Sequence, residues 1–435
     1  MGVSAPAQLI LEPLIVVSLC VAAGMWGVFQ FSQFEFIKLC RGFDLWFDSD
    51  PARTVANITS RWVPFHERSN LHPLYSLFIA APFGVIGEVF KLSTSAIVMW
   101  YVAVQAAAYA SGAYIVMRLF GLMRLDALLG VLLIFSTAAG IFWIGFPEWI
   151  AFGATAVFFS LAWVAVTSSL RNQFKGVVQN LLSGSIVVTG WAIGVMASLV
   201  ADWPKLQWAE AYRHTRDALA LMAALTVVQY FVFPTAGGFL NIWLELKIAA
   251  EKGAANIATY SLVAPSIEFF AQTLLAPEVK VLGGPRTVPG WGVLITTSQG
   301  QGVTINILSA VVLIFWIALW VLGLVAAIQG NLKRPVVVMV IGALTYFYML
   351  HMMFGGEIFL FSLYFAPLMV FIALWGVFSR HRVVIRCLCA ALIAASAVHN
   401  YPSFRSAVAI HNAIDLSWLE REATASAFTA TMDCR

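Results

Sequence analysis

The chain has 435 residues, of which 61% are hydrophobic and only 11% are charged, and its mean hydropathy is +0.87. This composition lies far outside the range of soluble globular proteins. The net charge of +4 is small and scattered along the chain, which excludes the basic surface of a nucleic-acid-binding protein. Several apolar runs have the roughly 20 residues needed to cross a bilayer core of about 30 Å, and the alternating pattern of a membrane β-barrel is missing. The sequence therefore predicts an all-α polytopic membrane protein.

The apolar runs predict about nine to eleven transmembrane helices in one integral domain that covers 1–435. One run, Val178–Val200, is flanked by basic residues on both sides, so we expect it to dip into the membrane and return, with a break near Gly190 or Gly194. The clearer spans are predicted at Leu9–Phe31, Ser95–Met117, Ala127–Gly145, Ile150–Ser168, Ala218–Phe233, Thr304–Ile328, Pro335–Phe354, Ile358–Phe378 and Val383–Val398.

One polar stretch, Asp44–Tyr75, interrupts this apolar chain. Its 32 residues include four acidic residues, three arginines and two histidines. The apolar run that follows, from His72 to Glu88, contains two prolines and is about 16 residues long, which is too short to span a bilayer. We therefore predict an interfacial segment there, and we interpret 32–94 as a catalytic outer loop with interfacial helices.

The positive-inside rule orients this loop relative to the membrane. If the basic turns face the cytoplasm, the polar stretch and Glu148 share the outer face, whereas counting 72–88 as a full span would reverse every later orientation. The same assignment places Glu357, a second large outer loop at 234–303 and a C-terminal tail at 399–435 outside. The basic turns are marked by Arg118 and Arg124, Arg171 and Lys175, Lys333 and Arg334, and Arg380, Arg382 and Arg386.

Acidic and basic side chains are predicted to converge on this outer face. A carboxylate beside a water-excluded surface can act as a general base for a hydroxyl nucleophile, although a lone loop acid is as often simply solvated. Guanidinium groups bind phosphate oxygens bidentately, and attraction to anionic lipid headgroups is the alternative explanation for the basic residues. The acidic candidates are Asp48, Asp50, Glu148 and Glu357, and the candidate phosphate- or substrate-binding residues of the first loop are Arg53, Arg61, His66, Arg68 and His72.

Two short motifs in this loop, DPAR at 50–53 and HPL at 72–74, resemble those of the GT-C class of membrane glycosyltransferases. Lipid A aminoarabinose transferases carry an Asp-Glu-x-Arg motif after the first span and a Lys-Pro-Pro before the interfacial helix. Protein O-mannosyltransferases carry Asp-Glu and His-Pro-Pro at these places. Both families also have an acid in the next outer loop, where this chain has Glu148.

The resemblance covers roughly 10–200 and implies inverting transfer of a sugar from a polyprenyl-phosphate carrier to an acceptor hydroxyl on a glycan, lipid or protein. The reaction would take place at the outer, periplasmic face of the cytoplasmic (inner) membrane. Asp50 would take the acceptor proton, while Arg, His or a metal ion would stabilise the lipid phosphate. The chain departs from the pattern at Pro51, which replaces the second acid, and in the additional Asp48, so either aspartate could be the base. The spacing of Asp48 and Asp50 also suits a divalent cation such as Mg²⁺ or Mn²⁺.

Further candidate residues lie outside the first loop. Lys280 and Arg286 stand in a Gly- and Pro-rich segment, where they suit a carrier phosphate or form an ordinary charged loop. His351 and Glu357, with neighbouring tyrosines, suit a sugar pocket, whereas aromatic residues at span ends are also common interface anchors. The five cysteines show no CxxC spacing and are interpreted as buried thiols.

A transporter, or a flippase of lipid-linked glycans, is the rival hypothesis. Such proteins have charged or broken helices near the bilayer midplane and often two related halves. The sequence has no internal repeat and largely uncharged span centres, so only the broken run at 178–200 favours this alternative. We therefore expect a GT-C-type glycosyltransferase of cell-envelope glycan or glycolipid modification. Membrane lipids are among its expected partners, and nucleic acid is not.

Overall fold

The computed structural model describes residues 5–41, 46–47, 49–63, 66, 71–166, 170–236, 247, 263–277, 281–288, 292–297, 303, 306–329, 334–354 and 358–413. Most of these residues are helical, and the chain is an all-α polytopic membrane protein with one added β-hairpin. The first part contains α1 (Ala5–Phe31), α2 (Phe36–Arg41), α3 (Pro51–Thr59), η2 (Ser76–Ala80), α4 (Ala81–Phe90), α5 (Thr94–Leu119), α6 (Arg124–Ser136), α7 (Ala138–Trp143), α8 (Ile150–Ala165), α9 (Gln173–Ser185), α10 (Gly190–Val200) and α11 (Trp208–Val232). The second part contains α13 (Val263–Leu274), β1 (Val281–Val288), β2 (Gly292–Thr297), α14 (Ile307–Ile328), α15 (Arg334–Phe354), α16 (Ser362–Leu374), η5 (Trp375–Phe378) and α17 (Arg382–Ala413).

Six helices in the described ranges are long and apolar enough to cross a membrane, namely α1, α5, α11, α14, α15 and α17. Four shorter apolar segments fall below that length, and they include α8, α10 and the η2–α4 segment Ser76–Phe90. These helices confirm a multi-pass protein. The predicted total of nine to eleven spans depends on how the shorter segments sit in the bilayer.

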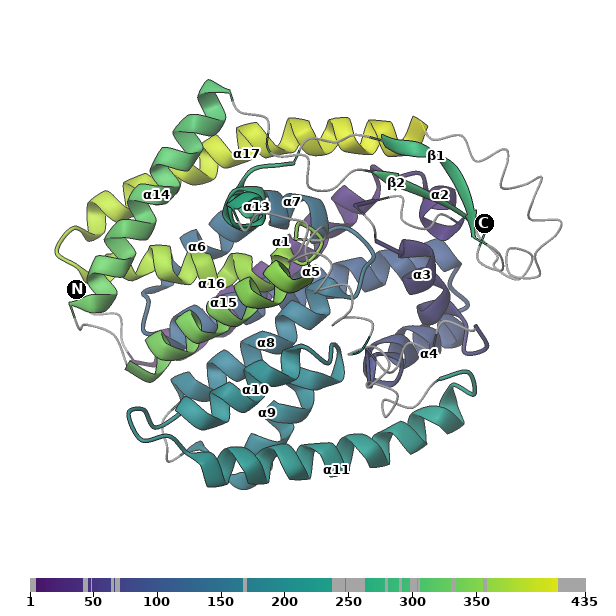
Figure 1. Ribbon diagram of the computed structural model, residues 1–435, viewed down its shortest axis with the longest axis horizontal. Coiled ribbons are helices and arrows are strands. Elements are labelled where there is room, and N and C mark those ends of the chain that lie inside the picture. Colours follow the sequence, from purple (N-terminus) through teal and green to yellow (C-terminus); the bar gives the residue numbers. More distant parts are fainter. Residues whose placement is uncertain are drawn as a thin grey trace.

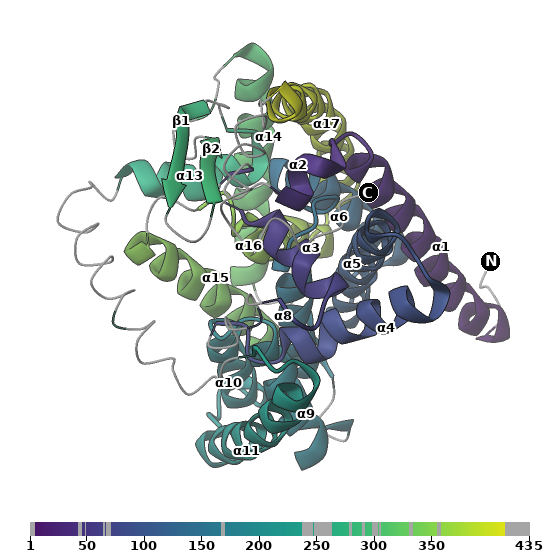
Figure 2. The ribbon, with the colours of Figure 1, turned by 90° about the vertical axis from the view of Figure 1, so that its right-hand side faces the viewer.

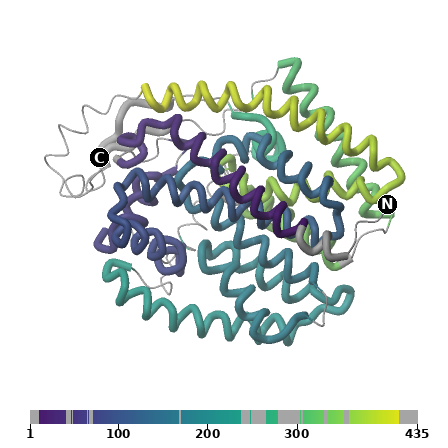
Figure 3. Tube along the Cα trace, turned by 180° about the vertical axis from the view of Figure 1, so that it is seen from behind, coloured from purple at the N-terminus to yellow at the C-terminus, as the bar shows by residue number. Residues whose placement is uncertain are grey.

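In Figure 1, α17 runs along one edge of the helix array and α11 along the other, both nearly horizontal, whereas α14 crosses α17 at a steep angle. In the view from behind, α1 crosses the array diagonally (Figure 3). A Cβ on Gly27 of α1 would lie 3.0 Å from Ala106 and 3.2 Å from the carbonyl of Val102 on α5. Small residues that let two backbones approach are typical of membrane helix pairs, and α1 packs on α5 in this way.

Helix α16 forms the centre of the array, because all its residues from Ser362 to Leu374 are buried. It packs against α6, α8, α14 and α15. A membrane helix surrounded by other helices exposes no face to lipid, so the part of the predicted span Ile358–Phe378 that forms α16 is an interior element.

The predicted third span, Ala127–Gly145, is broken into α6 and α7 at Thr137. Ser136 and Thr137 direct their hydroxyls to carbonyls three residues back, at 2.9 and 2.7 Å, and such local bonds compete with a continuous helix. The carbonyl of Ser136 instead accepts from Asn400 Nδ2 of α17 at 3.0 Å. The break is therefore stabilised by a partner distant in sequence.

The run predicted to dip and return forms two helices, α9 and α10, with the break at 186–189, next to Gly190. The pairing is antiparallel, since Gly190 packs on Ser183 whereas Gly194 contacts Gln179, which lies earlier in α9. A Cβ on Gly190 would lie 2.2 Å from the carbonyl of Ser183, so only glycine permits this close packing. The structure confirms the break and the reversal of direction.

The helix ends gather into two groups. The basic end is defined by Arg118, Arg124, Arg171, Arg382 and Arg386. Ion pairs of Glu12 with Arg118 and Arg124 join this end to the start of α1, and Figure 1 marks the N-terminus on this side. The loop end, defined by α2, α3 and α4, lies opposite, together with the antiparallel hairpin of β1 and β2. Figure 2, viewed from the loop end, shows these elements facing the reader.

Candidate functional site

The candidate site begins at the first turn of α3. Pro51 occupies the first turn of this helix, where its missing N–H costs nothing. Asp50 precedes it as the N-cap residue, but its side chain makes no capping hydrogen bond. The carboxylate instead pairs with Arg53, with Asp50 Oδ2 and Arg53 Nη1 at 2.5 Å. The two side chains are 20% and 17% exposed, so the pair lies at the edge of the protein interior and can be reached from outside.

Glu148 lies beside α3 although it is almost a hundred residues away in sequence. It sits in the turn between α7 and α8 and is only 4% exposed. Its Oε1 accepts from Thr54 Oγ1 at 3.5 Å and from the backbone N–H of Trp149 at 3.3 Å. Thr54 follows Arg53 on α3, so Glu148 contacts the helix that begins beside the Asp50–Arg53 pair. The sequence analysis proposed these residues from separate motifs.

Buried tyrosines surround this carboxylate. Tyr75 donates to the hydroxyl of Tyr101 at 3.1 Å, and both are at most 4% exposed. Burial raises the pKa of Tyr75 well above its usual value, and the nearby charge of Glu148 raises it further, so Tyr75 stays a neutral hydrogen-bond donor. The hydroxyl of Tyr364 is also buried, with no hydrogen-bond partner among the residues the structure describes. It lies over Gly153, where a Cβ would come within 1.8 Å.

The HPL motif is held by the tip of the α9–α10 hairpin. His72 Nδ1 lies 3.0 Å from the carbonyl of Ile186, and its ring packs on Trp149 with centroids 4.3 Å apart. The backbone N–H of Leu74 donates to the carbonyl of Ser185 at 2.8 Å. Gln229 on α11 donates to the carbonyl of Pro73 at 2.9 Å and accepts from Leu77. His72 therefore lies beside the residue that follows Glu148, in a segment fixed from two sides.

His66, a predicted phosphate-binding residue, has both ring nitrogens within hydrogen-bonding distance of described neighbours. Its Nε2 lies 2.9 Å from the carbonyl of Ser60, which can only accept, so Nε2 carries the proton. Its Nδ1 then accepts from the hydroxyl of Ser76 at 2.7 Å. Burial lowers the pKa of His66 to about 4. A neutral ring engaged at both nitrogens supplies no positive charge to a phosphate.

Two other candidates lie apart from this cluster. Arg61 is exposed, and its guanidinium stands 4.8 Å from the ring centroid of Trp62, itself 66% exposed. His351, on α15, is buried among Phe269, Phe361 and Phe365. Its Nε2 has no hydrogen-bond partner within the described part of the chain. Neither side chain is tied to Glu148 by a hydrogen bond or ion pair in that part.

Several predicted residues cannot be placed. Asp48, Arg68, Lys280 and Glu357 lie outside the described residues, and Arg286 lies on β1 without a described side chain. Among the described residues, no group of three His, Cys, Asp or Glu side chains could hold a metal ion. Asp50, the described member of the proposed cation pair, is already engaged by Arg53. Because Asp48 lies outside the described residues, the cation pair stays a prediction, and no chemical step is derived through a metal ion.

The cysteines differ from the prediction of five buried thiols. Cys40 is disulfide-bonded, and Cys387 is exposed, while Cys389 is a buried free thiol and Cys20 a half-buried one. Cys40 lies on α2 at the loop end. A stable disulfide requires an oxidising compartment, so this bond is evidence about which side of the membrane the loop end faces.

Residues that the sequence analysis did not single out complete the site. Thr54 and Tyr101 contact Glu148 or its tyrosine neighbour, and Gln229 fixes the HPL segment. Thr54 directly follows the DPAR motif, so its place in the sequence could have marked it as a neighbour of the site. Tyr101 lies inside α5, and Gln229 lies near the end of α11. Only their tertiary contacts distinguish these two residues from other residues of apolar helices.

The fold and the site together define a multi-pass membrane protein of helices, with a buried acidic residue and an acid–arginine pair at the loop end. No family model, curated protein or solved structure matches the chain.

Proposed function

We propose that this protein is an inverting glycosyltransferase that uses a polyprenyl-phosphate sugar donor, with its site at the loop end. The observation that carries the proposal is the linkage of the Asp50–Arg53 pair through Thr54 to the buried Glu148. Asp50 and Arg53 come from one of the segments that the resemblance to GT-C enzymes singles out, and Glu148 comes from another and contacts the same helix through Thr54. Ionisable groups held at membrane depth are costly and are commonly functional.

In the proposed reaction, Asp50 accepts the proton of the acceptor hydroxyl as its oxygen bonds to the anomeric carbon of the sugar. The bond between that carbon and the carrier phosphate breaks, and its electron pair leaves with the phosphate, so the configuration inverts. Arg53 orients Asp50 and is close enough to stabilise the departing phosphate. Glu148, Tyr75 and Tyr364 supply hydrogen-bonding groups that suit sugar hydroxyls.

The location that supports this chemistry is the outer face of the cytoplasmic membrane. The arginines of the basic end suit the cytoplasmic side by the positive-inside rule, which puts the loop end outside. The disulfide of Cys40 at the loop end independently favours an oxidising compartment. We infer that donor and acceptor meet on the outer side. Glycan, lipid and protein remain the candidate acceptor classes.

The test is transfer of labelled sugar from synthetic polyprenyl-phosphate donors by the full chain in detergent or proteoliposomes. We expect Asp50→Asn to lower the rate by about 10²- to 10⁴-fold, the range of a lost general base, and Glu148→Gln to lower it as well. Glu88→Gln changes an exposed acid on α4 at the same end and should leave transfer unchanged. Full transfer by both Asp50→Asn and Glu148→Gln would refute the assignment.

A transporter or flippase is the second candidate, and one observation favours it. The α9–α10 hairpin carries buried polar side chains, with Asn180 bonded to Ser198 at 2.8 Å and Ser198 bonded to His214 at 3.2 Å. Broken helices with polar groups are typical of transport sites. Movement of a fluorescent lipid-linked sugar across proteoliposomes, without any transfer product, would favour this function over the glycosyltransferase.

A further inference from the structure

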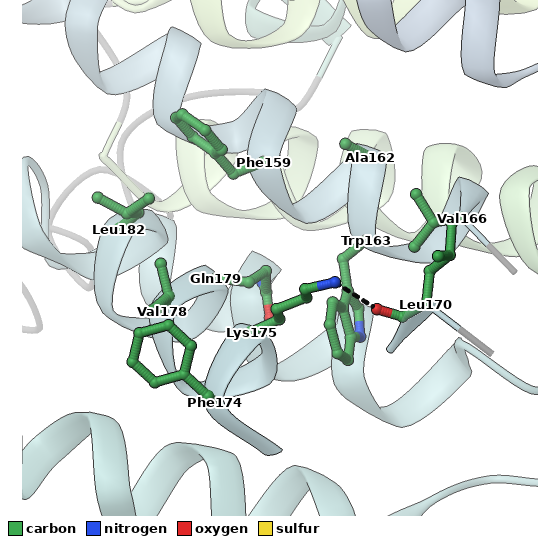
Figure 4. Close-up of a pocket in the computed structure, with 10 residues that line it drawn as sticks. All are labelled: Phe159, Ala162, Trp163, Val166, Leu170, Phe174, Lys175, Val178, Gln179 and Leu182. Atoms are coloured by element: carbon green, nitrogen blue, oxygen red, sulfur yellow. Dashed lines mark hydrogen bonds between the residues drawn. The ribbon is translucent and has the colours of Figure 1, made fainter. Parts of the chain in front are cut away.

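The cavity between α8 and α9 has a volume of about 350 Å³ and an almost entirely apolar lining. Figure 4 shows its ten lining residues, of which only Lys175 is charged, and Lys175 donates to the carbonyl of Leu170 at 3.0 Å. Such a lining offers a polar ligand almost no partners. The group that the proposed reaction leaves unused lies instead at the loop end, in the disulfide of Cys40 on α2.

The bonded partner of Cys40 follows from the other cysteines of the chain. The sequence has five cysteines, and Cys20, Cys387 and Cys389 are free thiols. Cys40 is disulfide-bonded. The structure contains a single chain, so the second sulfur of this bond belongs to the same chain. Elimination leaves Cys434, which lies outside the described residues.

The last helix ends beside the helix that carries Cys40. Asn412, one residue before the end of α17, donates from Nδ2 to the carbonyl of Gln33 at 2.8 Å. Its Oδ1 accepts from the N–H of Glu35 at 3.0 Å, and its carbonyl accepts from Lys38 on α2. These bonds hold the end of α17 against the α1–α2 turn and α2. The segment that follows α17 therefore starts close to Cys40.

The distance along the chain permits the return to α2. The 20 residues of 414–433 separate α17 from Cys434, and a chain of this length reaches about 70 Å when extended. A disulfide needs Cα atoms only roughly 4–7 Å apart, and this segment has to come back only to the helix that touches its start. Cys40 itself is 0% exposed, so the bonded sulfur is shielded from reductants in solution.

We propose that Cys40 and Cys434 form a disulfide that ties the C-terminal segment 414–435 to α2 at the loop end. The bond forms by thiol–disulfide exchange with a protein thiol oxidase. The two thiols give up two protons and two electrons, which reduce the disulfide of the oxidase to two thiols. Such oxidants act in oxidising compartments, in keeping with the outer location proposed for the loop end. The assignment does not depend on the proposed glycosyltransferase activity.

The bond supports the helix that begins at the candidate site. Helix α2 packs on α3, whose first turn holds the Asp50–Arg53 pair. The hydrogen bonds of Asn412 and the disulfide attach both ends of the segment 414–434 to the region of α2. The last part of the chain is thereby closed into a loop on the side of the acid–arginine pair.

A fragment-release assay tests the bond directly. The full chain receives a specific protease site after Ala425 and an epitope tag after Arg435. Free thiols are alkylated in the membrane, and the chain is then unfolded in urea so that cleavage does not depend on access. We expect the tag to stay attached after cleavage and to be released by dithiothreitol.

Substitutions identify the two sulfurs. Cys434→Ser should release the tag without reductant, whereas Cys387→Ser, which changes an exposed free cysteine, should retain it like the wild type. Release of the tag from the unreduced wild type would overturn the proposal. A tagged band at twice the mass would show a bond between two copies and would overturn it as well.

Thermal unfolding in detergent tests whether the bond supports the fold. Cys434→Ser should lower the melting temperature of the wild-type chain but leave that of a Cys40→Ala chain unchanged, because two residues that act through one bond are fully coupled in a double-mutant cycle. Equal shifts in the two backgrounds would show that Cys434 acts without Cys40 and would contradict the assignment.

Discussion

At the scale of single residues, buried polar side chains hold the irregular parts of the chain in place. Asn400 on α17 donates to the carbonyls of Ser136 and Leu274, at 3.0 and 2.7 Å, and accepts from the N–H of Ala276 at 2.9 Å. His66 similarly joins Ser60 to Ser76. Each such side chain forms hydrogen bonds with backbone or hydroxyl groups that would otherwise be buried without a partner. A buried polar group without a partner lowers the stability of the fold by roughly 1–3 kcal/mol.

His66 should make stability depend on pH. Its pKa is about 4 in the folded protein and 6.5 in the unfolded chain, so the unfolded state binds the proton first. Stability is therefore complete above pH 6.5 and falls as the pH drops toward 4, by about 2 kcal/mol at pH 5. Thermal unfolding in detergent between pH 7.5 and 4.5 measures this fall. His66→Gln should show a smaller fall, and an identical pH profile in the variant would contradict the assignment.

At the scale of elements, the α9–α10 hairpin links the interior of the array to the loop end. At its tip, the carbonyl of Ser185 accepts from the backbone N–H of Leu74, and the carbonyl of Ile186 contacts Nδ1 of the His72 ring. Tyr346 on α15 donates to the carbonyl of Thr189 at 2.9 Å, which fixes the tip from the other side. The position of His72 therefore depends on how closely α9 and α10 pack.

Gly190→Val should separate the two helices of the hairpin. A side chain there would meet the carbonyl of Ser183, a backbone atom that cannot move aside, so we expect a loss of about 1–3 kcal/mol from overpacking. Thermal unfolding measures the change. Gly84→Ala is the matched control, because its Cβ would meet only the carbonyl of Ile58 at 3.7 Å. Equal melting temperatures for Gly190→Val and the wild type would show that the hairpin is more loosely packed.

At the scale of the whole molecule, charge is divided between the two ends. At the basic end, Glu12 on α1 pairs with Arg118 at 2.6 Å and Arg124 at 3.0 Å. Asp126 on α6 pairs with Arg386 on α17, also at 2.6 Å. These pairs join helices far apart in sequence, and arginines still outnumber the acids there. The resulting asymmetry is what orients a membrane protein during insertion.

Surface labelling should distinguish the two ends. Trp62→Cys introduces a thiol at an exposed position of the loop end, and His381→Cys introduces one at an exposed position of the basic end. We expect a membrane-impermeant maleimide to label Trp62→Cys in intact cells and His381→Cys only after permeabilisation. The wild-type chain, whose free cysteines include Cys20, Cys387 and Cys389, sets the background. The reverse labelling pattern would invert the proposed orientation.

The sequence by itself determined that the chain is a helical membrane protein, because apolar runs of bilayer length are a local property. It also predicted a break near Gly190 or Gly194 and identified the segments that hold Asp50, Arg53 and Glu148, because prolines, glycines and charges are conspicuous in an apolar chain. The charged positions of the loop end could thus be identified before their contacts were known.

Only the tertiary structure decided which of these residues meet. Thr54 joins Glu148 to α3, His66 became a neutral structural residue and α6 ended at Thr137, in each case through partners distant in the chain. The disulfide of Cys40 likewise carried no local signal. Hydropathy sets which segments enter the membrane, whereas the pairing of buried polar groups depends on which helices become neighbours. That choice is made by packing over the whole array.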